Sequence, residues 1–107
     1  MIELIVYLEA DGSSPFRTWL DGLDRPAAEK VTTALQRMAN GNFGDVKPVG
    51  EGVSERRIDW GPGYRLYFAK DGNHLVVLLG GGTKRRQQAD IEDAQSRWAD
   101  YERRKGS

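Results

Sequence analysis

Residues 53–80, VSERRIDWGPGYRLYFAKDGNHLVVLLG, have the pattern of three β-strands joined by two turns. Apolar side chains recur there with the two-residue period of strands, and glycine-rich turn sequences, WGP and KDGN, interrupt the period twice. Such turns connect neighbouring antiparallel strands. We therefore predict an antiparallel meander with strands at residues 53–59, 63–69 and 74–80.

The N-terminal half of the chain predicts one strand followed by two helices. Residues 1–8 are rich in β-branched and aromatic side chains, and the pattern stops at Asp11-Gly12. Ser14-Pro15 provides the capping residue and first-turn proline of a short amphipathic helix. Asp24 can cap a second helix, whose apolar stripe ends before Asn40-Gly41. These two helices are expected to form a hairpin.

A last helix is predicted at residues 86–104, with Trp98 and Tyr101 on its apolar side. The predicted order is therefore β-α-α-β-β-β-α in one domain, residues 1–107. Helices grouped before the meander favour an α+β fold. In this fold, two N-terminal helices pack on one face of a small, mainly antiparallel twisted sheet, and a C-terminal helix completes the domain.

The composition excludes several kinds of chemistry. The chain has no cysteine and a single histidine, so disulfides, thiolate nucleophiles and the usual structural zinc sites are excluded. We expect neither a metal nor a cofactor. The chain also lacks an apolar stretch of about 20 residues and a signal-peptide pattern at its start. We therefore expect a cytoplasmic protein that does not contact a membrane.

Charge is unevenly distributed along a chain whose formal net charge is zero. Residues 47–86 carry 8 basic and 4 acidic side chains, whereas both flanking segments are net negative. Such a basic middle segment can contact phosphate, although a solvated charged surface explains the same pattern.

Side-chain alternation places two arginines of the meander on one face of the sheet. Leu66 and Phe68 must fill the core side, so Arg65 should point away from the helical hairpin into solvent. The same argument places Arg57 beside Arg65. Two neighbouring guanidinium groups suit a phosphate, but a surface ion network with Glu55 and Asp59 is the alternative. On either reading, truncating Arg65 should leave the fold intact.

The segment Gly80-Gly81-Gly82-Thr83 should leave the last strand as a loop and lead into Lys84-Arg85-Arg86 at the start of a helix. Exposed backbone N–H groups and three cations would then meet at a helix N-terminus, which attracts phosphate. The spacing is not that of a P-loop.

The chain resembles the RelE/HigB superfamily of toxins, and in particular its addiction module killer protein branch. The resemblance is carried by three segments and extends over almost the whole chain, with the Gly-Tyr-Arg element of the second as its most specific part. The segments are GVSERRID at 52–59, GPGYRLYF at 61–68, and GGTK at 81–84 followed by QQADI at 87–91.

The resemblance implies the toxin of a type II toxin–antitoxin system, a RelE-like endoribonuclease that cleaves mRNA, usually on the ribosome. In this superfamily the ribose 2′-oxygen attacks the adjacent phosphate without a metal. The expected partners are a helix-turn-helix antitoxin, mRNA and the ribosome, with DNA contacted only through the antitoxin. Two alternatives remain open: a gyrase-targeting toxin of the same superfamily, and a non-catalytic regulator that binds the antitoxin.

The resemblance also assigns roles to residues. Arg65, Arg57 and Lys84 match the catalytic basic positions, with Arg65 stabilising the transition-state phosphate. Many relatives have a tyrosine or histidine near the start of the last helix, where this chain has Gln87, Asp90 and Ile91, so Asp90 is the candidate for proton transfer. A helix-start aspartate is equally expected for dipole reasons. Further RNA contacts are expected from Arg56, Arg85, Arg86 and Trp60.

Overall fold

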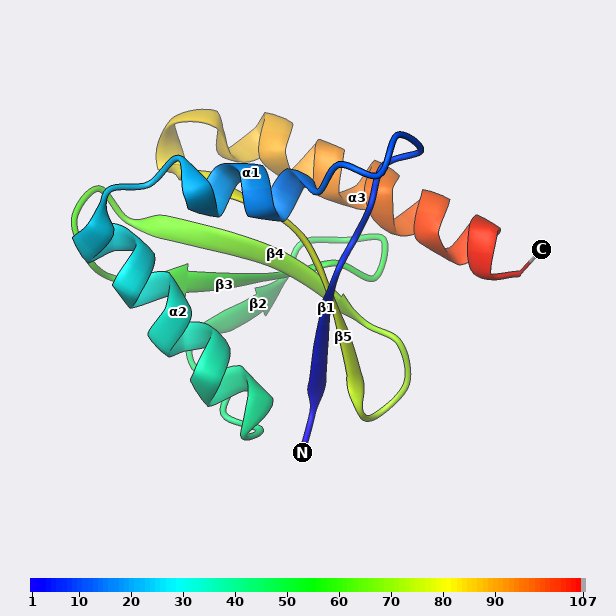
Figure 1. Ribbon diagram of the computed structural model, residues 1–107, viewed down its shortest axis with the longest axis horizontal. Coiled ribbons are helices and arrows are strands. Elements are labelled where there is room, and N and C mark those ends of the chain that lie inside the picture. Colours follow the sequence, from blue (N-terminus) through cyan, green and yellow to red (C-terminus); the bar gives the residue numbers. More distant parts are fainter. Residues whose placement is uncertain (107) are drawn as a thin grey trace.

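The protein, described here as a computed structural model over residues 1–106, has an α+β fold in which helices cover both faces of a five-stranded sheet (Figure 1). The predicted fold class is confirmed. The elements in chain order are β1 (Glu3–Val6), α1 (Pro15–Asp21), α2 (Arg25–Ala39), β2 (Val46–Pro48), β3 (Ser54–Ile58), β4 (Tyr64–Lys70), β5 (Leu75–Thr83), the 3₁₀ turn η1 (Lys84–Arg86) and α3 (Gln87–Lys105).

The sheet has the strand order β1-β5-β4-β3-β2. β2, β3, β4 and β5 are successively antiparallel, and β1 pairs in parallel with β5. The predicted meander is therefore present. The short strand β2 was missed, because three residues at the edge of a sheet carry too little periodicity to predict a strand.

The two N-terminal helices start at the predicted capping residues. The Ser14 side chain accepts a hydrogen bond from the Arg17 N–H, and the Asp24 carboxylate accepts one from the Ala27 N–H. Each cap satisfies a donor that the first helical turn cannot pair, which contributes about 0.5–2 kcal/mol. The predicted starts of α1 and α2 are therefore confirmed.

Two apolar layers hold the helices on the sheet. The first lies between the sheet and α1 and α2, and its buried members are Phe16, Val31, Ala34, Met38, Ile58, Leu66, Phe68, Val76 and Leu78. The second lies between the opposite face and α3, and contains Tyr7, Val53, Tyr67, Ala69, Val77, Leu79, Ala94 and Trp98. The face that carries Arg57 and Arg65 is thus partly covered by α3.

The strand β5 continues to Thr83, so the predicted glycine loop at residues 80–83 is wrong. Gly81 pairs with Leu66 and Gly82 pairs with Arg65 in the ladder with β4. Glycine is needed because helices approach the strand closely: a Cβ at Gly81 would lie 2.3 Å from the Trp19 ring. Within residues 1–106, no helix is long and apolar enough to cross a membrane.

Candidate functional site

Arg57 of β3 and Arg65 of β4 stand directly opposite each other in the antiparallel ladder. Their neighbours Ile58 and Leu66 point into the core beneath α1 and α2, so both arginines lie on the other face. The predicted juxtaposition is confirmed. Side chains at opposite positions have Cβ atoms about 4.5–5.5 Å apart, so the two arginine stems run side by side.

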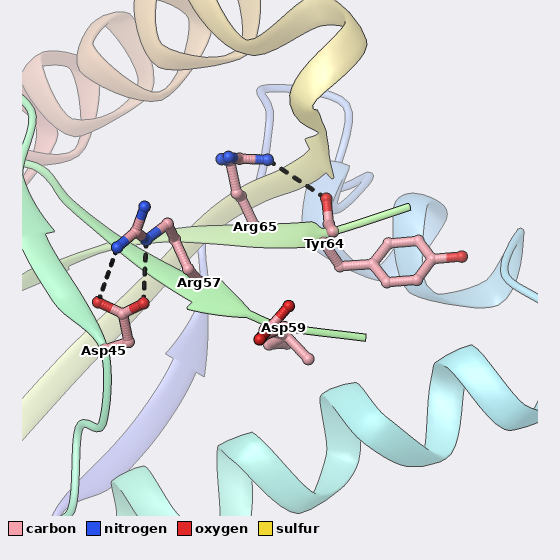
Figure 2. Close-up of a pocket in the computed structure, with 7 residues that line it drawn as sticks. Asp45, Arg57, Asp59, Tyr64 and Arg65 are labelled. Carbon is pink, nitrogen blue, oxygen red and sulfur yellow. Dashed lines mark hydrogen bonds and ion pairs between the residues drawn. The ribbon is translucent and has the colours of Figure 1, made fainter. Parts of the chain in front are cut away.

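The two arginines line a pocket of about 320 Å³ at the turn end of the β3–β4 hairpin (Figure 2). We call it the arginine pocket. Its lining contains two cations and two carboxylates, so it is polar without a net charge. The lining residues are Asp45, Arg57, Ile58, Asp59, Gly63, Tyr64 and Arg65.

Arg57 is half-exposed and forms a two-pronged ion pair with Asp45 (Figure 2). Arg57 Nε donates to Asp45 Oδ2 at 3.0 Å, and Nη2 donates to Oδ1 at 3.3 Å. These bonds raise the pKa of the Arg57 guanidinium above its ordinary value. An exposed pair of this kind contributes little to stability, so an incoming anion can compete for Arg57.

A buried carboxylate, that of Glu55, lies next to the Arg65 side chain. The Arg65 side chain is 12% exposed, and its Nε lies 3.6 Å from Oε1 of Glu55, which has no exposed surface. Arg65 Nη1 also donates to the Gly63 carbonyl at 3.3 Å. Two expectations are therefore corrected: Arg65 does not extend freely into solvent, and Glu55 is not part of a surface ion network.

Glu55 connects the sheet to the first residue of α3. Its Oε2 accepts a 2.9 Å hydrogen bond from Nε2 of Gln87, and its strand partner is the buried Tyr67. Burial, followed by the negative charges of Glu55 and Asp90, raises the pKa of the Tyr67 hydroxyl. Glu55 therefore faces Nε of the Arg65 guanidinium from inside the protein, while Nη1 is hydrogen-bonded to Gly63 at the pocket.

Asp90 lies over the strand residue opposite Arg65. A Cβ on Gly82 would be 2.1 Å from Oδ2 of Asp90, and Gly82 is the ladder partner of Arg65 on β5. The Asp90 carboxylate therefore occupies the same sheet face as Arg65. Burial raises its pKa, although the charges of Arg86 and Arg97 oppose the shift. It lines a separate cleft, between α1 and α3.

The cations of η1 follow the strand rather than a glycine loop. Lys84 directly succeeds Thr83, whose ladder partner is Tyr64 of the arginine pocket. Lys84 therefore follows the end of β5 but does not line the arginine pocket, and Lys84, Arg85 and Arg86 are all exposed. The predicted cluster of free N–H groups is wrong, because the ladder with β4 includes Gly81 and Gly82.

Arg56 and Trp60 lie apart from the arginine pocket. Arg56 alternates with Arg57 along β3, so its side chain lies on the α2 side of the sheet, where the residue is 9% exposed. Trp60 is partly buried and stacks on Tyr64, with ring centroids 6.3 Å apart. An RNA contact by Arg56 would therefore lie on the opposite sheet face from Arg57.

Sequence reasoning missed Asp45 and Gln87. Asp45 immediately precedes β2, and its role depends on the pairing of Val46 with Arg56, which the missed strand creates. Gln87 reaches Glu55 across 32 residues of sequence, and no local pattern signals such a contact. Within residues 1–106, no three His, Asp or Glu side chains are grouped so that they could bind a metal ion.

A curated protein of Haemophilus influenzae (strain Rd), called "Uncharacterized protein", is 44% identical to this chain over 80 residues. The matched region covers 74% of this chain and 81% of the Haemophilus protein. No protein-family model matches the chain.

Proposed function

We propose that this chain, which belongs to the same family as the uncharacterized Haemophilus influenzae protein, is the endoribonuclease toxin of a type II toxin–antitoxin system. The observation that carries the proposal is the opposed pair Arg57 and Arg65 at one pocket. Together with Lys84, which directly follows β5, this pair matches the catalytic basic positions of the RelE/HigB superfamily that the sequence resembles.

The proposed reaction is cleavage by the RNA itself, with the protein stabilising charge. The ribose 2′-oxygen bonds to the adjacent phosphorus, the bond to the 5′-oxygen breaks, and a 2′,3′-cyclic phosphate remains. The proton of the 2′-hydroxyl leaves, and a proton joins the 5′-oxygen. Planar guanidinium groups suit the phosphate oxygens that gain charge in the transition state.

The two arginines would have different parts in this reaction. Arg65 is held by Glu55 and Gly63, so its guanidinium needs little reorganisation when the phosphate arrives. Arg57 is the more exposed of the two, and it can exchange the exposed carboxylate of Asp45 for a phosphate oxygen. We therefore assign transition-state stabilisation to Arg65 and substrate capture to Arg57.

Asp90 is the candidate for one of the proton transfers. Its carboxylate lies on the sheet face of Arg65, and burial raises its pKa above the ordinary value. Lys84, at the end of β5, would contribute further positive charge. The assignment of Asp90 rests on its position, because it does not line the arginine pocket itself.

We propose two partners for this chain. The chain has no net charge, so we propose that docking on the ribosome supplies much of the affinity for mRNA. We also propose that a helix-turn-helix antitoxin neutralises the toxin by covering the Arg57/Arg65 face. If the two proteins co-purify and toxicity is suppressed while RNA still reaches Arg65, the antitoxin would instead act allosterically.

One observation favours a second candidate, a non-catalytic protein whose activity is antitoxin binding. Arg57 faces Asp45 and Arg65 faces Glu55, so each arginine already has a carboxylate partner. In a purely structural network, both pairs would persist and no RNA would be cut.

A translation-coupled cleavage assay separates the two candidates. Purified chain is added to translating ribosomes with a test mRNA, with Arg57→Ala as the pocket variant and Arg25→Ala, an exposed arginine of α2, as the charge-matched control. We expect cleavage by the wild type and by Arg25→Ala, with 2′,3′-cyclic phosphate ends, and little cleavage by Arg57→Ala. Intact mRNA with a folded wild-type chain would reject the endoribonuclease.

A further inference from the structure

A second cleft lies on the opposite side of β3, between this strand and α2. We call it the α2 cleft. It has a volume of about 260 Å³ and combines side chains of the helix with those at the end of the strand. The lining residues are Lys30, Thr33, Ala34, Arg37, Arg56, Ile58, Asp59 and Trp60.

The α2 cleft has an excess of positive charge. Lys30, Arg37 and Arg56 are basic, and Asp59 is the single acidic residue of the lining. Among residues 1–106, no carboxylate forms a salt bridge with any of the three cations; the salt bridges there join other residues. This differs from the arginine pocket, where each arginine has a carboxylate partner.

Arg56 is the most constrained of these cations. The residue is 9% exposed, its Nη1 donates to the Arg57 carbonyl, and its buried Nε has no hydrogen-bond partner in the described chain. Burial lowers the pKa of the guanidinium, the charge of Arg37 lowers it further, and the charge of Asp45 opposes the shift. An anion between Arg37 and Arg56 would relieve this repulsion.

An aromatic pair connects the two sites. Trp60 lines the α2 cleft, Tyr64 lines the arginine pocket, and the two rings stack. Ile58 and Asp59 line both sites, so the sites adjoin around the end of β3. Lys30 Nζ lies 5.9 Å from the centroid of the Trp60 ring. Cations beside aromatic rings are typical of sites that bind single-stranded nucleic acid.

We propose that the α2 cleft binds a backbone phosphate of the same RNA strand whose scissile phosphate occupies the arginine pocket. That the ligand is RNA rests on the proposed function. The α2 cleft itself would bind a phosphate group, which Arg37 and Arg56 contact. Trp60 would lie against the neighbouring nucleotide.

The test measures binding of a single-stranded oligodeoxynucleotide, which lacks the 2′-hydroxyl and so cannot be cleaved by the proposed reaction. Arg37→Gln is compared with Arg25→Gln, because both are exposed arginines of α2 and Arg25 lies outside the cleft. We expect Arg37→Gln to weaken binding about tenfold, as for one lost charge-assisted hydrogen bond. The slope of log binding constant against log salt concentration should become less steep by about 0.7 for this variant only.

NMR of the indole N–H groups locates the bound anion. Trp60→Phe assigns the Trp60 resonance, and we expect the oligonucleotide to shift it in the wild type and much less in Arg37→Gln. Inorganic phosphate is the second probe. A Trp60 shift with phosphate but none with the oligonucleotide would overturn the assignment to RNA and leave a site for a free phosphate compound.

The outcomes distinguish this inference from the proposed function. If the chain cleaves mRNA but Arg37→Gln and Arg25→Gln bind the oligonucleotide equally well, the α2 cleft is not a phosphate site and the inference is wrong. If the oligonucleotide binds in an Arg37-dependent manner but the chain cleaves no mRNA, the cleft is supported and the endoribonuclease is rejected.

Discussion

Replacement of Arg65 by alanine tests both the buried ion pair and the proposed site. Arg65→Ala removes the cation 3.6 Å from the fully buried Glu55. Breaking one side of a buried pair costs about 3–5 kcal/mol, because an uncompensated charge remains inside. Small domains have a total stability of about 5–15 kcal/mol. The variant should therefore be strongly destabilised, whereas the sequence alone predicts an exposed Arg65 and a loss of at most about 1 kcal/mol.

A second variant separates stability from activity. Glu55→Gln combined with Arg65→Ala removes both charges and keeps a side-chain oxygen that can accept the hydrogen bond from Gln87. Neutral replacement of a buried pair is often close to neutral in stability, so the double variant should recover most of the loss. Its cleavage rate should remain about 10²- to 10³-fold below that of the wild type, as after loss of one oxyanion donor.

The assay is urea denaturation of the wild type, both single variants and the double variant, together with mRNA cleavage by each. A coupling energy close to zero in this double-mutant cycle would show that Glu55 and Arg65 do not interact. Wild-type cleavage by the folded double variant would remove Arg65 from the reaction.

Three further predictions concern the surroundings of the site. Arg57→Ala should leave the free energy of unfolding almost unchanged, because its ion pair is exposed, yet it should abolish growth arrest. A melting curve and a plate assay check the two expectations, and growth arrest by the folded variant would contradict the role of Arg57. Burial raises the pKa of Asp90 above its ordinary value of 3.8, so its ionised form is disfavoured in the folded state. Asp90→Asn should therefore be more stable than the wild type at pH 7. Denaturation at several pH values should show that this gain shrinks as the pH falls through the raised pKa and vanishes below 3.8; a constant gain would exclude titration of Asp90 as its cause. Gly81→Ala should destabilise the protein by about 1–3 kcal/mol, because the new Cβ would lie 2.3 Å from the Trp19 ring. Gly22→Ala is the control, since the nearest atom to a Cβ there is 3.5 Å away. Equal melting temperatures for the two variants would refute the close packing at Gly81.

The fold could be predicted from local signals that act within a few residues. Ser14 and Asp24 cap the helices that they were predicted to cap, and alternation assigned Leu66 and Arg65 to opposite faces. The extension of β5 to Thr83 could not be predicted, because glycines normally weaken a strand and here permit close contact with α1 and α3.

The sequence predicts that Arg57 and Arg65 of the candidate site are neighbours, but not that Arg65 is largely buried. The opposition of Arg57 and Arg65 follows from register alone. The depth of Arg65 depends on α3, whose first residue, Gln87, covers Glu55 from a distant part of the sequence. Asp45 could not be recognised as the partner of Arg57 without the edge strand β2. Tertiary packing therefore decides which charges are exposed, and periodicity does not.

The most direct test of the central claim is to map RNA 5′ ends in cells that express the chain without an antitoxin. The wild type is compared with the double variant Glu55→Gln/Arg65→Ala, after both are shown to be folded. If the arginine pocket cleaves mRNA, new RNA ends within translated reading frames and growth arrest should occur for the wild type only. The same RNA ends in both strains, or none in a strain that contains folded wild-type protein, would contradict it.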